Sequence, residues 1–156
     1  MNRTAKLITS ILICLFAGLV GSVFTMPAIP TWYAGLNKPS FSPPNWLFGP
    51  VWTTLYVLMG ISFFLVWEKL KKNPKAKSAL DIFVLQLVLN CLWSVIFFGL
   101  KAPLLALIEI ILLWLVILIT IINFFKISKT AGWLLVPYLA WVSFASFLNW
   151  TIWRLN

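Results

Sequence analysis

Few residues of this sequence could do chemistry, and most of these are amides and indoles. Gln86 and Asn90 lie about one helical turn apart in an apolar stretch, and Trp93 and Phe97 continue the same helical face. An amide deep in a bilayer is costly unless it is paired, so both side chains should face the interior of a helix bundle. They could join helices by hydrogen bonds or orient a ligand in an apolar cavity, and the sequence leaves both roles open.

Two further stripes of mainly aromatic, apolar and small residues repeat at helical spacing. They consist of Trp52, Tyr56 and Met59, and of Trp141, Ala145, Leu148, Asn149 and Ile152. The small Ala145 between two larger side chains leaves room for a ligand. The three stripes therefore predict a shared cavity.

Ionisable and metal-binding side chains are scarce. Glu109 is the one acid clearly within an apolar stretch, and we expect it to reach back to the interface or to pair with Lys101. A proton relay would need further ionisable partners. Histidine is absent, which excludes ligation by His and the commonest general base. Cys14 and Cys91 occur in apolar stretches without a CxxC motif, so neither a disulfide nor a metal site is predicted.

The elements that must position these residues are membrane-spanning helices. Hydrophobic residues make up 62% of the 156 residues and charged residues 10%, against about 25% charged in soluble domains. Because a spanning helix needs about 20 apolar residues, and only helices or barrels satisfy the backbone in lipid, we predict an all-α membrane protein. One domain, residues 1–156, should contain five transmembrane helices, at about 5–26, 48–67, 80–100, 103–125 and 133–153.

The first stretch resembles a signal peptide because Arg3 and Lys6 precede it. It is longer than a usual signal sequence and lacks a convincing cleavage site, so we interpret it as a retained helix. Small residues at 17, 18, 21 and 22 would let another helix approach closely.

The basic residues indicate an orientation. The N-terminus and the second and fourth connections hold nine Lys and Arg residues, and the opposite side holds three. The positive-inside rule then places the N-terminus in the cytoplasm and the C-terminus outside. This distribution accounts for the net charge of +9 better than nucleic-acid binding does. We expect a multi-pass protein of a bacterial cell membrane, with the lipid bilayer as its solvent.

The connection 27–47 is unusual because it contains five prolines together with Trp32, Tyr33, Phe41 and Trp46. Such a segment could form an aromatic belt at the membrane surface, or a rigid lid over a cavity between helices.

Several motifs together resemble the translocator protein family, the TspO/MBR group, which includes the peripheral-type benzodiazepine receptor and bacterial tryptophan-rich sensory proteins. They are WYAGLNKPSFSPP at 32–44, GPVWTTLY at 49–56, Met59-Gly60, Leu89-Asn90, Trp93, Phe97-Phe98-Gly99, PYLAW at 137–141 and FASFLN at 144–149. Only the first and fourth spans lack such a motif.

The resemblance implies a five-helix bundle, usually a homodimer, with a ligand cavity beneath the first loop. It implies protoporphyrin-type tetrapyrroles and isoquinoline carboxamide or benzodiazepine drugs as ligands, with no required cofactor. The matching positions are Tyr33, Pro44, Trp52, Asn90, Trp93, Trp141, Ala145 and Leu148. Animal members bind sterol through a C-terminal motif, but here Leu148, Trp150 and Arg154 align with it, and Trp replaces its Tyr. That departure argues against a sterol ligand.

The sequence thus predicts a membrane receptor or sensor for a planar, mostly apolar ligand. Free-base porphyrin is a better candidate than haem because histidine is missing. Trp52 and Trp141 match tryptophans that some bacterial relatives are proposed to use in light-dependent porphyrin breakdown, so such an enzyme is the main alternative. A transporter is a further alternative, although neither an inverted repeat nor paired intramembrane charges are visible.

Overall fold

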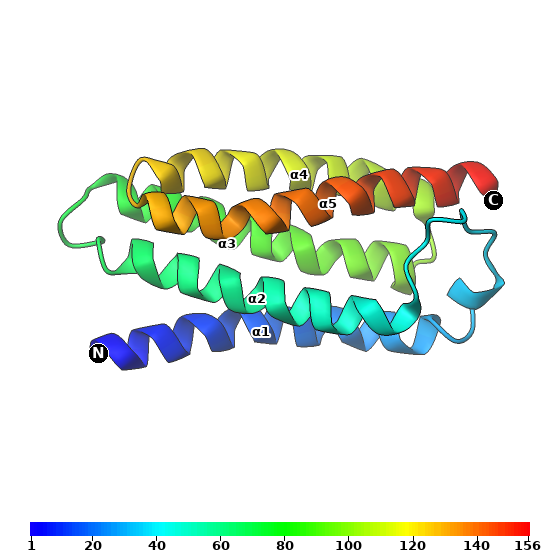
Figure 1. Ribbon diagram of the computed structural model, residues 1–156, viewed down its shortest axis with the longest axis horizontal. Helices are drawn as coiled ribbons and strands as arrows, with labels where there is room; N and C mark the ends of the chain where they lie inside the picture. Colours follow the sequence, from blue (N-terminus) through cyan, green and yellow to red (C-terminus); the bar gives the residue numbers. More distant parts are fainter.

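The computed structural model describes residues 1–156, and its regular structure is entirely helical (Figure 1). Five helices are long and apolar enough to cross a membrane. They are α1 (Arg3–Ala28), α2 (Asn45–Trp67), α3 (Lys75–Ser94), α4 (Pro103–Phe125) and α5 (Lys129–Leu155). A short 3-10 helix, η1 (Tyr33–Gly35), interrupts the first connection, and a π-helical turn, η2 (Val95–Gly99), extends α3. The prediction of an all-α fold with five spans is confirmed.

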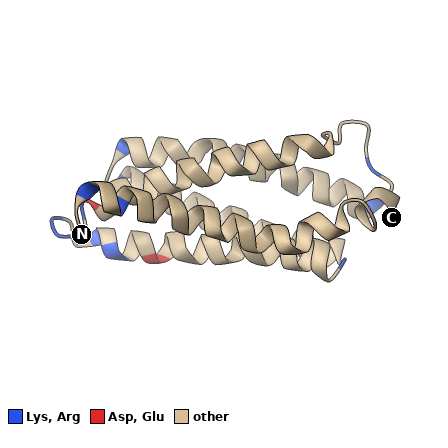
Figure 2. Ribbon diagram, turned by 90° about the horizontal axis from the view of Figure 1, so that it is seen from below, with Lys and Arg blue, Asp and Glu red and all other residues tan.

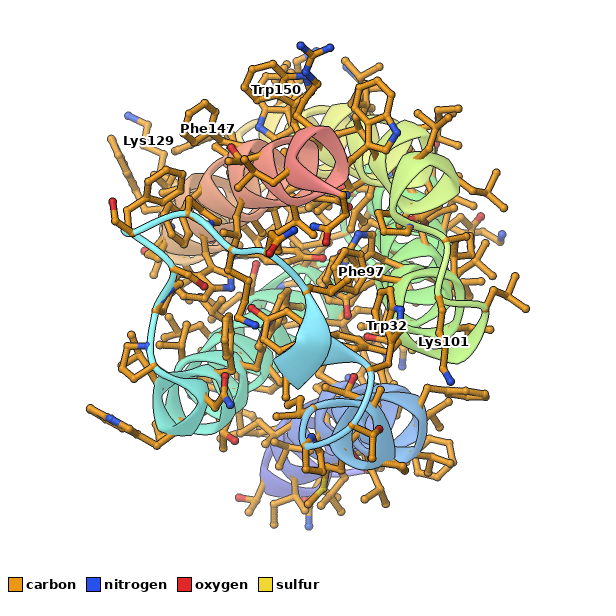
Figure 3. The ribbon with its side chains drawn as sticks, turned by 90° about the vertical axis from the view of Figure 1, so that its right-hand side faces the viewer. Trp32, Phe97, Lys101, Lys129, Phe147 and Trp150 are labelled. Carbon is orange, nitrogen blue, oxygen red and sulfur yellow. The ribbon has the colours of Figure 1, made fainter.

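The helices run along one common direction and form a ring (Figures 1 and 3). Around the ring the order is α1, α2, α5, α4 and α3, and α3 packs against α1 to close it. The N-terminus lies with the α2–α3 and α4–α5 connections at what we call the N-terminal end of the bundle (Figure 1). The C-terminus, the α1–α2 connection and the α3–α4 turn lie at the opposite, C-terminal end.

The helices extend beyond most of the predicted bounds. Helix α1 continues through Pro27, α2 begins at Asn45 and α3 begins at Lys75. Hydropathy detects the part of a helix that suits hydrocarbon, whereas the hydrogen-bonded helix continues into the more polar interface. The predicted connection 27–47 is therefore shorter and runs from 29 to 44.

Close helix contacts in the N-terminal half depend on small residues. A Cβ atom on Gly60 of α2 would lie 2.5 Å from the Cα atom of Ile11 in α1. Similarly, a Cβ atom on Gly132 of α5 would lie 2.5 Å from the ring of Phe125. The predicted close approach through the small residues of α1 is also confirmed, because a Cβ atom on Gly18 would meet the Tyr56 ring at 2.5 Å.

Candidate ligand-binding cavity

The α1–α2 connection folds around Tyr33, whose side chain is 3% exposed. The Lys38 Nζ atom donates to the backbone oxygens of Tyr33 (2.8 Å) and Leu36 (3.2 Å). The same ammonium group lies 4.7 Å from the centroid of the Tyr33 ring, within range of a cation–π contact. Burial raises the pKa of the Tyr33 hydroxyl, and the Ser42 side chain partly opposes that shift. Tyr33 is therefore a neutral hydrogen-bonding group at ordinary pH.

The connection is also fastened to the end of α5. The Asn37 backbone N–H donates to Asn156 Oδ1 (3.0 Å), and Asn156 Nδ2 donates to the Asn37 backbone oxygen (2.9 Å). Asn37 Nδ2 adds a bond to the Leu155 backbone oxygen (3.2 Å). Phe41 stacks on Phe147 with a centroid distance of 5.4 Å. The segment crosses the end of the bundle (Figure 3), in an arrangement that fits the lid interpretation.

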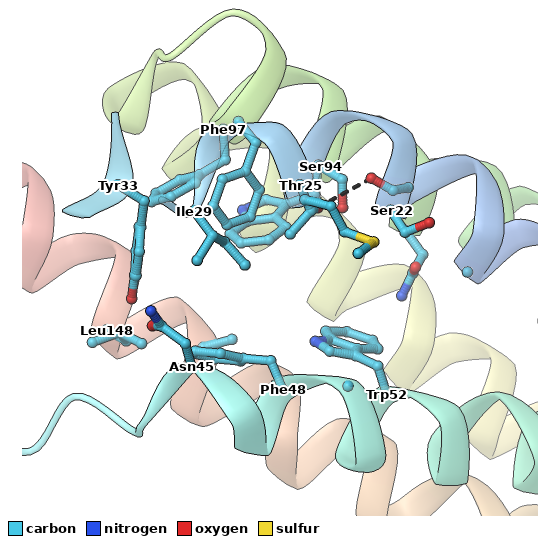
Figure 4. A pocket seen from close by; sticks show the side chains of 18 of the residues that line it. Ser22, Thr25, Ile29, Tyr33, Asn45, Phe48, Trp52, Ser94, Phe97 and Leu148 are labelled. Atoms are coloured by element: carbon cyan, nitrogen blue, oxygen red, sulfur yellow. Dashed lines mark hydrogen bonds between the residues drawn. The ribbon is translucent and has the colours of Figure 1, made fainter. Parts of the chain in front are cut away.

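Beneath this lid the helices enclose a cavity of about 430 Å³, a size typical of sites for small molecules (Figure 4). None of the side chains lining it is charged. The exposed rim residues Met26 and Trp46 come from α1 and α2, so the rim lies between these helices. The walls consist of Gly18, Gly21, Ser22, Thr25, Met26, Ile29, Tyr33, Asn45, Trp46, Phe48, Gly49, Trp52, Tyr56, Asn90, Trp93, Ser94, Phe97, Phe98, Trp141, Ala145, Leu148, Asn149 and Ile152.

The π turn η2 shapes one wall of the cavity. A π turn contains more residues than an α turn, which changes the faces that successive side chains occupy. Both Phe97 and Phe98 line the cavity as a result. Phe97 stacks on Trp93 with a centroid distance of 4.9 Å and meets the edge of Trp32 at 5.4 Å. This cluster of Phe97, Trp93 and Trp32 joins α3 to the lid. After the π turn, the backbone enters α4 through Lys101, whose φ of 55° is left-handed.

A chain of hydrogen bonds reaches the floor of the cavity, where its members Tyr56 and Asn90 are part of the wall. The Tyr56 hydroxyl donates to Asn90 Oδ1, Asn90 Nδ2 donates to the Tyr138 hydroxyl (2.8 Å), and that hydroxyl donates to Gln86 Oε1 (2.7 Å). Asn90 is 4% exposed and is the central member of this chain. An Asn amide offers two donors and two acceptor positions, and one of each is used here. Asn90 therefore joins helices by hydrogen bonds and keeps one donor and one acceptor position unused, while its role in orienting a ligand stays a prediction.

Two indole groups differ in how they are held. Trp93 Nε1 donates to Asn149 Oδ1 (3.0 Å), and Asn149 Nδ2 donates to the Pro103 backbone oxygen (2.9 Å). This pair of bonds fixes the Trp93 ring between α3 and α5. In contrast, Trp141 Nε1 is buried and has no hydrogen-bond partner. A buried N–H without a partner is costly, so a ligand acceptor that reaches it would be favoured.

The structure brings seven of the eight predicted site residues together on the cavity wall. They are Tyr33, Trp52, Asn90, Trp93, Trp141, Ala145 and Leu148. Pro44 is the exception, because it lies just before the first residue of α2 and does not line the cavity. Its fixed backbone suits the start of a helix, so it positions α2 rather than contacting the enclosed space.

Helix α1 provides a wall that the sequence did not reveal. Gly18, Gly21, Ser22 and Thr25 line the cavity. The small residues of α1 were interpreted only as contacts between helices, and the resemblance carried no motif in this span. Asn149 was noticed as part of a stripe, but its bond to Trp93 joins two helices that no local pattern connects.

One expectation about an individual residue needs correction. Glu109 neither reaches the interface nor pairs with Lys101, because both carboxylate oxygens are buried without a partner while Lys101 is exposed. Glu109 lies on the face of α4 that packs inside the bundle, together with Ala106 and Ile110. For the sterol motif, Leu148 lines the cavity whereas Trp150 is 45% exposed. Leu148 and Trp150 therefore do not share one surface, and the argument against a sterol ligand stays a prediction.

The ring of spanning helices defines a polytopic membrane protein that holds an aromatic cavity under a fastened loop. Residues 10–154 match the model of the TspO/MBR family, and the chain belongs to that family. It is similar to the tryptophan-rich protein TspO of Archaeoglobus fulgidus, with 50% identity over 97% of each chain. It is 41% identical to protein CrtK of Rhodobacter capsulatus, covering 92% of this chain and 88% of that one.

The human translocator protein is 43% identical, over 88% of this chain and 82% of the human one. The resemblance inferred from the motifs is therefore confirmed. Family membership and the five apolar helices together establish an integral, multi-pass membrane protein.

Proposed function

We propose that this protein is a membrane receptor or sensor for a planar, largely apolar ligand, with a tetrapyrrole such as protoporphyrin as the foremost candidate. The observation that carries the proposal is the aromatic cavity with Asn90 at its floor. Indole and phenyl rings offer flat faces to a conjugated macrocycle. The remaining donor and acceptor of Asn90 can orient a polar group of the ligand.

The lack of charged side chains on the cavity wall restricts how such a ligand binds. A carboxylate buried without a partner is costly, so the ring system of protoporphyrin belongs inside and its carboxylates at the rim. Met26 and Trp46 mark that rim between α1 and α2. Neutral isoquinoline carboxamides meet no such restriction and serve as a second probe.

The direct test is to titrate the purified protein in detergent, in the dark, with protoporphyrin and with an isoquinoline carboxamide. Ala145→Phe places a ring in the cavity, and we expect it to weaken binding at least about tenfold, or about 1.4 kcal/mol. Ala140→Phe is the matched control, because Ala140 is exposed on the same helix. Unchanged affinity in a folded Ala145→Phe variant would exclude this cavity as the site.

Illumination separates a receptor from an enzyme. Trp52 and Trp141 both line the cavity, but no general base or metal ligand accompanies them there. Light on a bound porphyrin produces reactive oxygen that can oxidise nearby tryptophan, so we expect porphyrin loss well short of many turnovers. The experiment illuminates excess protoporphyrin with wild type and with a Trp52→Phe/Trp141→Phe variant. Complete conversion to one product by wild type alone would make the protein an enzyme.

We also propose that the N-terminal end of the bundle faces the cytoplasm, because it carries nine of the twelve Lys and Arg residues. Reporter fusions in the 69–77 segment should then be cytoplasmic, and fusions after Asn156 should be external. Reporters that give the same side at both positions would contradict this arrangement.

A further inference from the structure

Exposed lysines gather at the N-terminal end of the bundle (Figure 2). They lie on the α2–α3 and α4–α5 connections and at the first residues of α3 and α5. We call this group the basic rim. It consists of Lys69, Lys71, Lys72, Lys75, Lys126 and Lys129.

The protein supplies no counter-charge for the basic rim. Glu68 already pairs with Arg3 (3.5 Å) and Lys6 (3.4 Å), which join the start of α1 to the end of α2. Asp81 pairs with Lys77 at 2.9 Å. The third acid, Glu109, is buried inside the bundle. The six ammonium groups of the rim therefore have no acidic partner within the chain.

Exposed apolar residues place the basic rim at the level of the lipid headgroups. Leu70, between Lys69 and Lys71, is 39% exposed, and Trp133, one turn beyond Lys129, is 65% exposed. Tryptophan at the end of a spanning helix is typical of the interface between hydrocarbon and water. Cations at this depth meet the phosphates of the surrounding lipids before they meet an acidic protein or a nucleic acid.

We propose that the basic rim binds the headgroups of anionic phospholipids, so that these lipids collect around this end of the protein. Positive orientation signals alone require only that the charges stay on one side of the membrane during insertion. Unneutralised lysines at headgroup depth also attract anionic lipid, and a cluster of four to eight such residues is typical of that interaction. The proposal does not depend on the ligand of the cavity.

The test compares spin-labelled phosphatidylglycerol with spin-labelled phosphatidylcholine around the purified full-length protein in nanodiscs. Both faces of a nanodisc are accessible, so the direction of insertion does not matter. We expect wild type to prefer phosphatidylglycerol about fivefold. One basic residue near the membrane surface attracts an anionic headgroup by about 1 kcal/mol, which corresponds to that ratio. High salt should reduce the preference because it screens exposed charges.

The variant Lys69→Gln/Lys71→Gln/Lys72→Gln should lose at least half of the preference, and Lys126→Gln/Lys129→Gln provides a second, independent variant of the rim. The matched control, Lys101→Gln/Arg154→Gln, removes exposed basic residues at the C-terminal end and should retain it. Circular dichroism verifies that each variant is folded. Equal association of both lipids with wild type would overturn the proposal, as would full preference in both rim variants or an equal loss in the control.

Discussion

The two halves of the bundle are built from the same five helices but differ in how those helices meet. In the N-terminal half, Phe83 and Phe124 stack with an interplanar angle of 8°, and Ser62 donates across the helix interface to the Ala131 backbone oxygen (2.7 Å). Gly60 lets α1 and α2 touch. In the C-terminal half the helices enclose a cavity of about 430 Å³ under a loop.

The difference shows that apolar composition alone does not decide whether a membrane bundle closes. Small residues at the contact points allow backbones to approach, whereas tryptophans and the π turn surround a space that the side chains do not fill. The hydrogen-bonded chain from Tyr56 to Gln86 lies at the boundary between the two arrangements. It pairs both hydroxyls, the Asn90 amide and the Gln86 side-chain oxygen, although Gln86 Nε2 has no partner, and it joins α2, α3 and α5.

The largest expected effect comes from disturbing the closed half. Gly60→Ala places a Cβ atom 2.5 Å from the backbone of Ile11, so α1 and α2 must separate. We expect a loss of about 2–3 kcal/mol in the free energy of unfolding in detergent. Gly49→Ala is the matched control in the same helix, because a Cβ atom there meets nothing within 4 Å. Equal stability of the two variants would mean that the closed half does not depend on this contact.

An intermediate effect is expected at the boundary. Tyr138→Phe removes the hydroxyl that accepts from Asn90 and donates to Gln86. Two buried amide groups then lose a partner, which should lower the free energy of unfolding by about 1–2 kcal/mol. Thr120→Val is the control, because its buried hydroxyl bonds only to Val116 in its own helix. A Tyr138→Phe variant as stable as this control would mean that this chain of hydrogen bonds does not stabilise the bundle.

The five spanning helices and much of the cavity wall could be predicted from the sequence, because spanning helices depend on local composition. The stripes at Asn90 and Trp93 and at Trp141 and Ala145 follow from helical periodicity, and these residues do line one cavity. Helix order around the ring is different, since it depends on contacts between residues far apart in the chain.

The features that sequence reasoning missed depend on such distant contacts. The bond between Trp93 and Asn149 joins positions 56 residues apart, and the buried state of Glu109 follows from the packing of α4 inside the ring. The π turn at Val95–Gly99 is equally hidden, because its sequence also suits an ordinary α-helix. Each outcome requires knowing which helices are neighbours.

The smallest expected effect concerns the lid, where the bonds between Asn37 and Asn156 are exposed to solvent. Exposed hydrogen bonds exchange easily for bonds to water, so their loss should hardly change the stability of the bundle. They do hold the loop against the end of α5. We therefore expect Asn156→Ala to speed dissociation of a cavity ligand about two- to fivefold, with a change of less than about 0.5 kcal/mol in unfolding free energy.

Hydrogen exchange gives a second measurement that does not require a ligand, because the Asn37 backbone N–H is one of the donors that would lose its partner. Its exchange should accelerate in Asn156→Ala, while amides in the closed half, around Ser62 and Phe83, should keep their wild-type rates. Asn123→Ala is the control, since Asn123 bonds only to Ile119 in its own helix. If the Asn156 variant speeds exchange throughout the bundle, the loop is part of the common core and the contrast between the two halves fails. Faster exchange confined to residues 29–44 would show that the C-terminal half opens by itself, by movement of its lid.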